Sequence, residues 1–147
     1  FLNKYGWEAM QGVKVDGCTD ITGFGLMGHA AEMARAGGVT LELYSHKVPV
    51  FPRAIEMASM GIIPAGAYRN RQYAENGVKL CKDIPQALQD IMYDPQTSGG
   101  LLVSIPQQYA QQSVTERQVL RWKPSREHPL HSLRFMTCAR ASTSAWS

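Results

Sequence analysis

The sequence predicts an α/β (α+β) fold, in which helices pack in layers on a mixed sheet. Three observations lead to this prediction. Residues 24–36 place their apolar side chains on one arc of a helix, residues 39–44 alternate between apolar and polar, and residues 101–105 form a continuous apolar run. The chain has 147 residues, which is enough for one domain with a core of its own.

The first residues predict the end of a helix and a strand after it. Apolar side chains within residues 2–11 suit a helix, and Gly12 is typical of the residue that stops one. The β-branched residues within 13–22 predict a strand that runs into a loop near Asp20. We expect residues 1–12 to be the end of a linker helix that comes from a missing N-terminal domain.

The helix over residues 24–36 is amphipathic, and its buried face is predicted from a spacing of about 100° per residue. Its apolar arc consists of Phe24, Leu26, Met27, Ala30, Ala31, Met33 and Ala34. The opposite, polar arc consists of Gly25, Gly28, His29, Glu32 and Arg35. The pair Gly37 and Gly38 predicts where this helix ends.

The rest of the domain is expected to alternate between helices and strands. In order, we predict a half-buried strand over 39–44, a short helix over about 53–60, a long loop over 62–82, a helix over 84–92 and a strand over 101–105 that is buried on both faces. The long loop is predicted because residues 62–82 contain Pro64, Gly66 and Gly77 and few periodic apolar positions. Residues 13–112 are then one α/β domain, truncated at its end.

The composition excludes several classes of protein. Apolar residues make up 44% and charged residues 18% of the chain, which is typical of a globular protein and not of a charged disordered one. No apolar run approaches the roughly 18 residues that cross a bilayer, so we expect no membrane partner. The three cysteines are far apart in sequence and form no CxxC pair, which favours a reducing cytoplasm over a disulfide scaffold or a zinc ribbon.

Residues 113–147 differ from the rest of the chain. They carry six Lys/Arg and two Glu, whereas residues 1–112 carry nine Lys/Arg and ten Asp/Glu. They also contain no glycine and show no sustained apolar period. We expect an atypical basic tail, either disordered or encoded out of frame. Because the basic charge belongs to this tail, it is poor support for nucleic-acid binding by the folded part.

The first candidate site lies where the strand ends and the amphipathic helix begins. Asp20 offers the oxygen ligands that Mg²⁺ prefers, and Thr22, Gly23 and Gly25 follow at a helix start that favours an anion. These residue types suit a metal–phosphate site. The alternative is structural: Asp20 caps the helix, and the glycines only allow tight packing.

The second candidate site is the loop at residues 94–100, with sequence DPQTSGG. Thr97 and Ser98 carry hydroxyl donors, and Gly99 and Gly100 have accessible amides, so the loop could hold an anion. The alternative is a tight turn before a central strand, in which Asp94 and Thr97 satisfy the backbone.

Other polar residues favour structural roles. His29, on the polar arc, is interpreted as a surface or interface histidine, and Cys18 as a small buried residue. The stretch at residues 68–71 is interpreted as a solvated loop, with an arginine-bearing flap that contacts phosphate as the alternative.

In this order and spacing, three stretches resemble the C-terminal half of selenophosphate synthetase (selenide, water dikinase). They are residues 19–29 (TDITGFGLMGH), residues 61–70 (GIIPAGAYRN) and residues 94–102 (DPQTSGGLL). The resemblance covers about residues 1–112. It implies the C-terminal α/β domain found in the superfamily of aminoimidazole ribonucleotide synthetase.

The resemblance also implies a function. Enzymes of this family make selenophosphate, AMP and phosphate from ATP, selenide and water, with Mg²⁺, and form a homodimer through the N-terminal domain. Their reactive Cys or Sec and their lysine lie in that N-terminal part, so no catalytic residue is assigned here. The aspartate of the Thr-Asp-x-Thr-Gly-Phe-Gly motif, which binds metal, corresponds to Asp20.

Two alternatives stay open. The chain could belong to another ATP-using member of the superfamily, such as a thiamine-monophosphate kinase or a purine-biosynthesis synthetase. It could also be an inactive fragment with only a structural role. The amino-acid sequences of the stretches at 23–29 and 94–100 favour selenophosphate synthetase over the other enzymes.

Overall fold

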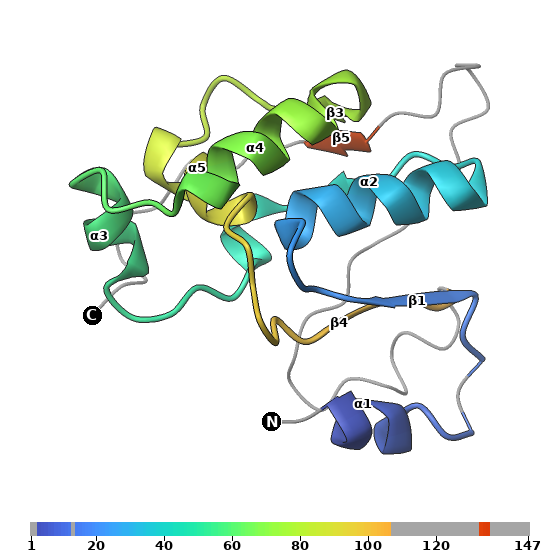
Figure 1. The fold of residues 1–147 in the computed structure, drawn as a ribbon. Coiled ribbons are helices and arrows are strands. Elements are labelled where there is room, and N and C mark those ends of the chain that lie inside the picture. Colours follow the sequence, from blue (N-terminus) through green and yellow to red (C-terminus); the bar gives the residue numbers. More distant parts are fainter. Residues whose placement is uncertain (1–2, 13, 107–132, 136–147) are drawn as a thin grey trace.

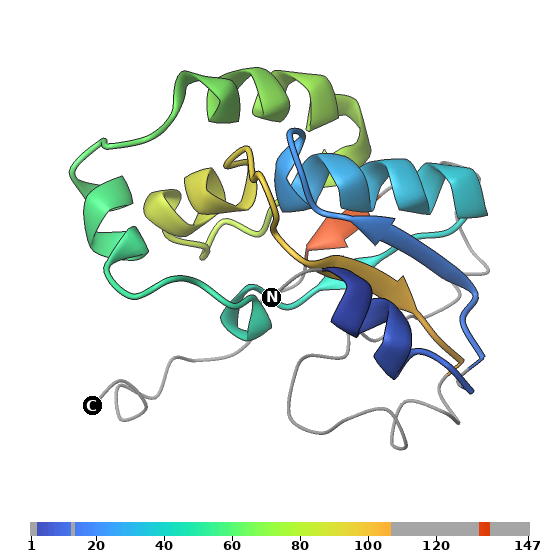
Figure 2. The same ribbon diagram turned by 60° about the horizontal axis from the view of Figure 1, so that its bottom comes forward.

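A two-stranded antiparallel ladder lies between two helices in the computed structural model (Figure 1). Strands β1 (Gly17–Asp20) and β4 (Leu101–Ser104) pair from Gly17 opposite Ser104 to Asp20 opposite Leu101. Helix α1 (Asn3–Ala9) lies on one side of this ladder and helix α2 (Gly25–Gly37) on the other (Figures 1 and 2). The structure describes residues 3–12, 14–106 and 133–135.

Both helices approach the ladder closely at a glycine. A Cβ atom on Gly6 of α1 would lie 2.7 Å from Leu101 Cδ1, and one on Gly17 of β1 would lie 2.9 Å from Met33 Cε of α2. Both neighbours are the ends of flexible side chains that can move aside, so these glycines allow the close packing of the layers without enforcing it.

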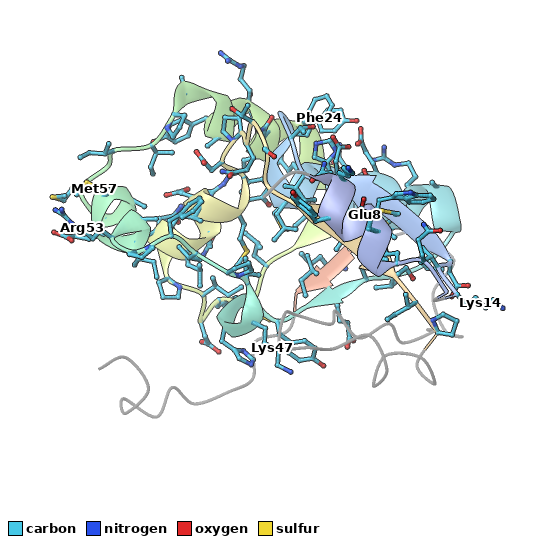
Figure 3. The ribbon with its side chains drawn as sticks, turned by 90° about the horizontal axis from the view of Figure 1, so that it is seen from below. Glu8, Lys14, Phe24, Lys47, Arg53 and Met57 are labelled. Carbon is cyan, nitrogen blue, oxygen red and sulfur yellow. The ribbon has the colours of Figure 1, made fainter. Side chains whose placement is uncertain are left out.

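Three further helices build the other half of the domain. They are α3 (Ala54–Ser59), α4 (Ala65–Ala74) and α5 (Gln86–Met92). Helix α4 packs along α2, and α5 packs against α3. In the side-chain view, Arg53 and Met57 mark the α3 end of the molecule, while Phe24 and Lys47 lie at opposite edges (Figure 3).

The remaining strands form a sheet of their own. Its order is β2 (Glu42–Leu43), β5 (Leu133–Phe135) and β3 (Val78–Lys79), and both pairings are parallel. The predicted α/β class is confirmed, but the single mixed sheet containing both 39–45 and 101–105 is wrong. The described strands divide into one antiparallel and one parallel sheet.

A single cluster of buried apolar side chains joins α2 to the other elements. Met27, Leu43 and Met92 are its largest fully buried members. Ile21, Ile84, Tyr93 and Leu102 are buried with them. The apolar arc predicted for α2 is confirmed at Met27, Ala30, Ala31 and Ala34, which are all buried. Leu26 and Met33 are half-buried against the core, and the prediction is wrong for Phe24, which is exposed.

The predictions for the helices were mostly confirmed. The helices predicted over 2–11, 24–36, 53–60 and 84–92 correspond to α1, α2, α3 and α5. Gly38, with φ of 61°, ends α2 as expected and donates its N–H to the carbonyls of Ala34 and Arg35.

The long loop predicted over 62–82 is wrong. These residues form α4, a 3₁₀ turn at Glu75–Gly77 and strand β3. The helix was missed because it buries Ala67, Asn70 and Ala74, so that no large apolar side chain marks its inner face.

Two strands also differ from expectation. The strand predicted over 39–44 is reduced to Glu42–Leu43, and the strand at 101–104 is not buried on both faces. Only Leu102 is buried there, and Leu101, Val103 and Ser104 are half-buried.

Most of the predicted tail over 113–147 lies outside the described residues, as do residues 107–112, where a helix turn was expected. Within the tail, the structure places residues 133–135 as β5 between β2 and β3. No helix in the described part of the chain is long and apolar enough to span a membrane.

Candidate functional site

The two candidate motifs lie side by side. We call residues 20–25 the aspartate turn and residues 93–100 the glycine loop. Three backbone hydrogen bonds join them: Ile21 N–H to Gly100 O (2.9 Å), Gly99 N–H to Ile21 O (2.9 Å) and Gln96 N–H to Thr22 O (3.0 Å). Segments about 75 residues apart in sequence therefore form one continuous structure at the end of the β1–β4 ladder.

Gly25 is the point of closest approach between the two segments. Its φ is +69°, and a Cβ atom there would lie 2.8 Å from the carbonyl carbon of Tyr93 and 2.9 Å from Asp94 O. Both neighbours are backbone atoms of the glycine loop, which cannot move aside as a flexible side chain can. Only glycine fits at this position.

Asp20 ends β1, and its side chain is exposed beside the aspartate turn. Its carboxylate forms no ion pair or side-chain hydrogen bond with another described residue. The alternative that Asp20 caps α2 is wrong, since the N-cap residue is Phe24 and no side chain caps the helix. An exposed carboxylate without a structural partner suits a hard cation.

One carboxylate does not make a complete metal site. Among the residues that the structure describes, no group of three or more His, Cys, Asp or Glu side chains is placed to hold a metal ion. The chemistry of Asp20 therefore fits Mg²⁺ as one ligand of a larger set.

The glycines of the candidate phosphate site divide into two kinds. Gly25 N–H donates to Thr22 O at 3.0 Å within the aspartate turn, and Gly99 N–H donates to Ile21 O across the two segments, so both amides are already used in the backbone structure. Gly23, Thr97 and Ser98 are exposed, and Gly100 is half-buried. The hydroxyls of Thr97 and Ser98 make no hydrogen bond with another described residue. Their contact with phosphate stays a prediction.

A chain of polar contacts runs from Thr22 along α2 to Tyr73 of α4. Thr22 Oγ1 lies 3.2 Å from His29 Nε2, His29 Nδ1 lies 3.4 Å from Glu32 Oε2, and Tyr73 O–H donates to Glu32 Oε1 at 3.0 Å. Phe24 stacks on Tyr73 with ring centroids 5.0 Å apart, and its edge contacts the His29 ring.

His29 is buried, so the prediction that it lies on the surface or at an interface, on the polar arc of the helix, is wrong. His29 is 8% exposed, and Gly25 and Gly28 are buried with it. Helix α4, which has no clear signal in the sequence, and the Phe24 ring cover this face of α2. A Cβ atom on Gly28 would lie 2.6 Å from Phe24 Cβ, which explains the glycine there.

Arg71 does not form a phosphate-binding flap. Its Nη2 lies 2.6 Å from Asp90 Oδ1 on α5, and its guanidinium lies over the Tyr93 ring, 5.2 Å from the centroid. Gln86 Nε2 donates to the same Asp90 oxygen at 2.9 Å. The Arg71–Asp90 pair joins α4 to α5, the Gln86 bond lies within α5, and the ring contact joins α4 to Tyr93 of the glycine loop. The neighbouring Arg69 is exposed.

Asn70 is a site residue that sequence reasoning missed. It is buried on α4, and its amide nitrogen donates to Gly23 O at 2.8 Å and to Tyr93 O at 2.9 Å. It therefore contacts both motif segments. The signal in the sequence was a polar residue at helical spacing between Ala67 and Ala74, with Pro64 before the first turn.

Burial shifts the pKa of three groups in this region. Burial raises the pKa of Asp94, and the hydrogen bond from Gln96 opposes the shift. Burial also raises the pKa of Tyr93, against the lowering effect of Arg71. Cys18 is exposed, so the prediction that it is a buried residue is wrong; partial desolvation and, to a smaller extent, the negative charge of Asp20 raise the pKa of its thiol.

Asp94→Asn should gain stability relative to the wild type as pH rises. Because the pKa of Asp94 is raised in the folded chain, the folded state binds more protons than the unfolded state, and unfolding free energy falls with pH in that interval. The amide lacks this penalty and can still accept from Gln96. Thermal unfolding of both proteins between about pH 4 and pH 7 measures the difference. A difference that stays constant, or narrows toward neutral pH, would contradict the raised pKa.

Comparisons with known proteins agree with these motifs. Over residues 4–118, the chain matches the family described as AIR synthase related protein, C-terminal domain. It is 57% identical over 109 residues to "Selenide, water dikinase 2" of Peptoclostridium acidaminophilum, covering 74% of this chain and 31% of the relative. It is 50% identical over 115 residues to "Selenide, water dikinase" of Clostridioides difficile, covering 78% of this chain and 33% of the relative.

The chain thus spans about a third of the length of these curated relatives. The resemblance to selenide, water dikinases that its motifs indicated is confirmed. Since the family match covers more than half of the chain, this protein belongs to the AIR synthase related family and contains its C-terminal domain.

Proposed function

We propose that this chain is the C-terminal part of a selenophosphate synthetase, which makes selenophosphate, AMP and phosphate from ATP, selenide and water. One observation carries the proposal: the aspartate turn and the glycine loop, each predicted to face a metal–phosphate group, join side by side with the Asp20 carboxylate exposed beside them. The identity of 57% to a selenide, water dikinase supports it.

In the proposed enzyme, Asp20 contributes one ligand to Mg²⁺. Bound Mg²⁺ neutralises the charge that moves between the phosphates of ATP. The chain's own part is to hold the carboxylate at the end of a paired strand. The ladder to Leu101 and the bond from Ile21 N–H to Gly100 O restrict the backbone on both sides of Asp20. A carboxylate that is already in place when the substrate binds raises the reaction rate, because no entropy is then lost in positioning it during the reaction.

The hydroxyls of Thr97 and Ser98 are the chain's proposed phosphate donors. Both side chains are exposed on the glycine loop. They lie between Gln96 and Gly99, whose backbone N–H groups donate to carbonyls of the aspartate turn. Thr22 is less available, because its hydroxyl contacts His29. Gly23 and Gly100 complete the surface that would face the phosphates.

The proposal includes further properties of the complete enzyme. ATP and selenide are its substrates, Mg²⁺ its metal, and a homodimer forms through its N-terminal domain. We place it in the cytoplasm, without a nucleic-acid or membrane partner. The near balance of charge in residues 1–112 supports the absence of a nucleic-acid partner.

The family description alone would suit another ATP-using member of the superfamily equally well. The relatives favour selenide as the substrate, since those at 57%, 50% and 47% identity are all named selenide, water dikinases. No comparable observation favours a thiamine-monophosphate kinase or a purine-biosynthesis synthetase.

A chimeric enzyme tests the proposal. The 109 matched residues of the Peptoclostridium acidaminophilum protein are replaced by the corresponding residues of this chain. We expect selenide-dependent formation of AMP from ATP within about tenfold of the parent rate, because both motif segments are retained. A folded chimera that forms no AMP would contradict the proposal and would favour an inactive fragment with a structural role.

A further inference from the structure

Helix α4 turns one face toward both motif segments. Gly66, Asn70 and Tyr73 follow one another at spacings of four and three residues, so they share this face. A Cβ atom on Gly66 would lie 2.9 Å from Pro95 Cγ in the glycine loop. Tyr73 contacts the other side through Glu32 and the Phe24 ring.

Asn70, between these two, contacts both segments through one group. Its Nδ2 donates to Gly23 O at 2.8 Å and to Tyr93 O at 2.9 Å, and its side chain is buried. Because both partners are carbonyl oxygens, only the nitrogen of the amide fits between them, and it uses both of its hydrogens. A carboxylate of the same shape at this position would face two acceptors.

The anchor of α4 is separate from Asn70. Arg71 and Asp90 join α4 to α5 through a 2.6 Å ion pair, which Gln86 also contacts. Loss of the Asn70 amide should therefore leave α4 in place while the aspartate turn and the glycine loop lose their common support.

We propose that Asn70 is a positioning residue, whose amide fixes the aspartate turn relative to the glycine loop and so sets how Asp20, Thr97 and Ser98 face a nucleotide phosphate. The part that concerns phosphate rests on the function proposed above. The part that concerns the two segments does not, and it is tested separately.

Amide hydrogen exchange on this chain tests the first part. The reporters are the N–H groups of Ile21, Gln96 and Gly99, which bridge the two segments. Asn70→Ala should speed their exchange by about tenfold or more, because two buried hydrogen bonds are lost. Asp90→Asn weakens the ion pair between Arg71 of α4 and Asp90 of α5 instead. In this variant the exchange rates of the three reporter amides should stay unchanged relative to those of the amides of α2.

Two outcomes would overturn the proposal. The three reporter amides exchange at the wild-type rate in Asn70→Ala, or their exchange accelerates no more than that of the amides of α2. Asn70→Ser retains one donor on a shorter side chain and replaces Asn70→Ala if that variant does not fold. We then expect a smaller acceleration of the same three amides, and an unchanged rate again overturns the proposal.

The chimeric enzyme tests the second part. Asn70→Ala should lower kcat at least about tenfold, because misplaced groups no longer meet the phosphates in the transition state, whereas Asp90→Asn should stay within about twofold of the unmodified chimera. Equal losses of kcat in the two variants would contradict the positioning role and show that Asn70 only stabilises the fold. If the chimera itself is inactive, the proposed function fails, while the exchange result still decides whether Asn70 holds the two segments.

Discussion

Gly25→Ala should destabilise this chain by about 3 kcal/mol or more, since two costs add at one position. The residue has φ of +69°, where an L-residue loses roughly 1–2 kcal/mol. The new Cβ would also lie 2.8–2.9 Å from three backbone atoms of Tyr93 and Asp94. Relieving that overlap moves the glycine loop away from the aspartate turn, at a further cost of about 1–3 kcal/mol. Urea unfolding at equilibrium measures the loss.

Gly61→Ala is the matched control. Gly61 has φ of +78° after α3, and nothing lies within 4 Å of the position that a Cβ would take. Only the backbone cost of roughly 1–2 kcal/mol should appear there. Similar losses in the two variants would show that Gly25 is retained for its φ alone, and that the close approach of the two motifs has little energetic weight.

The sequence predicted a helix where apolar residues recur with a helical period and include large side chains, such as Met27 in α2. Met27, Ala30 and Ala34 mark the inner face of α2, and Gly38 marks its end, so this helix was predicted within one residue. Helix α4 had no such signal. It is buried through small and polar residues, and its buried Asn70 contacts two carbonyls that are 47 and 23 residues away in sequence.

The pairing of the strands could not be predicted in the same way. An alternating or apolar run indicates that a segment is a strand, but it does not indicate which other strand it pairs with. Residues 101–104 pair with residues 17–20 and not with residues 42–43, so that two sheets form. The two-residue strands β2 and β3 give almost no pattern of their own.

The candidate site was predicted as two motifs, but its supports were not. Asp20, Thr97 and Ser98 lie exposed, as a binding role requires. The burial of His29 and the amide bond of Gly99 follow from contacts between segments that are distant in sequence. Side-chain chemistry could be assigned from the sequence, whereas the groups that fix it in place depend on the tertiary structure.

Asp20→Asn should have the largest effect on activity. The substitution keeps the shape of the side chain and removes its charge. The Asp20 side chain is exposed and caps no helix, so its loss should cost stability only a few tenths of a kcal/mol. A metal ligand that loses its charge, in contrast, weakens the binding of Mg²⁺ and leaves the phosphate charge less neutralised. We expect ATP turnover to fall by at least about a thousandfold.

The most direct measurement is therefore selenide-dependent AMP formation by the chimeric enzyme at increasing Mg²⁺, for Asp20→Asn and for Asp16→Asn. Asp16 is also exposed and precedes the same strand, so it controls for the loss of one negative charge. Asp16→Asn should match the unmodified chimera. Asp20→Asn should melt at nearly the same temperature and form almost no AMP at any Mg²⁺ concentration. Near-normal AMP formation by the Asp20→Asn chimera would contradict the assignment of Asp20 as a metal ligand.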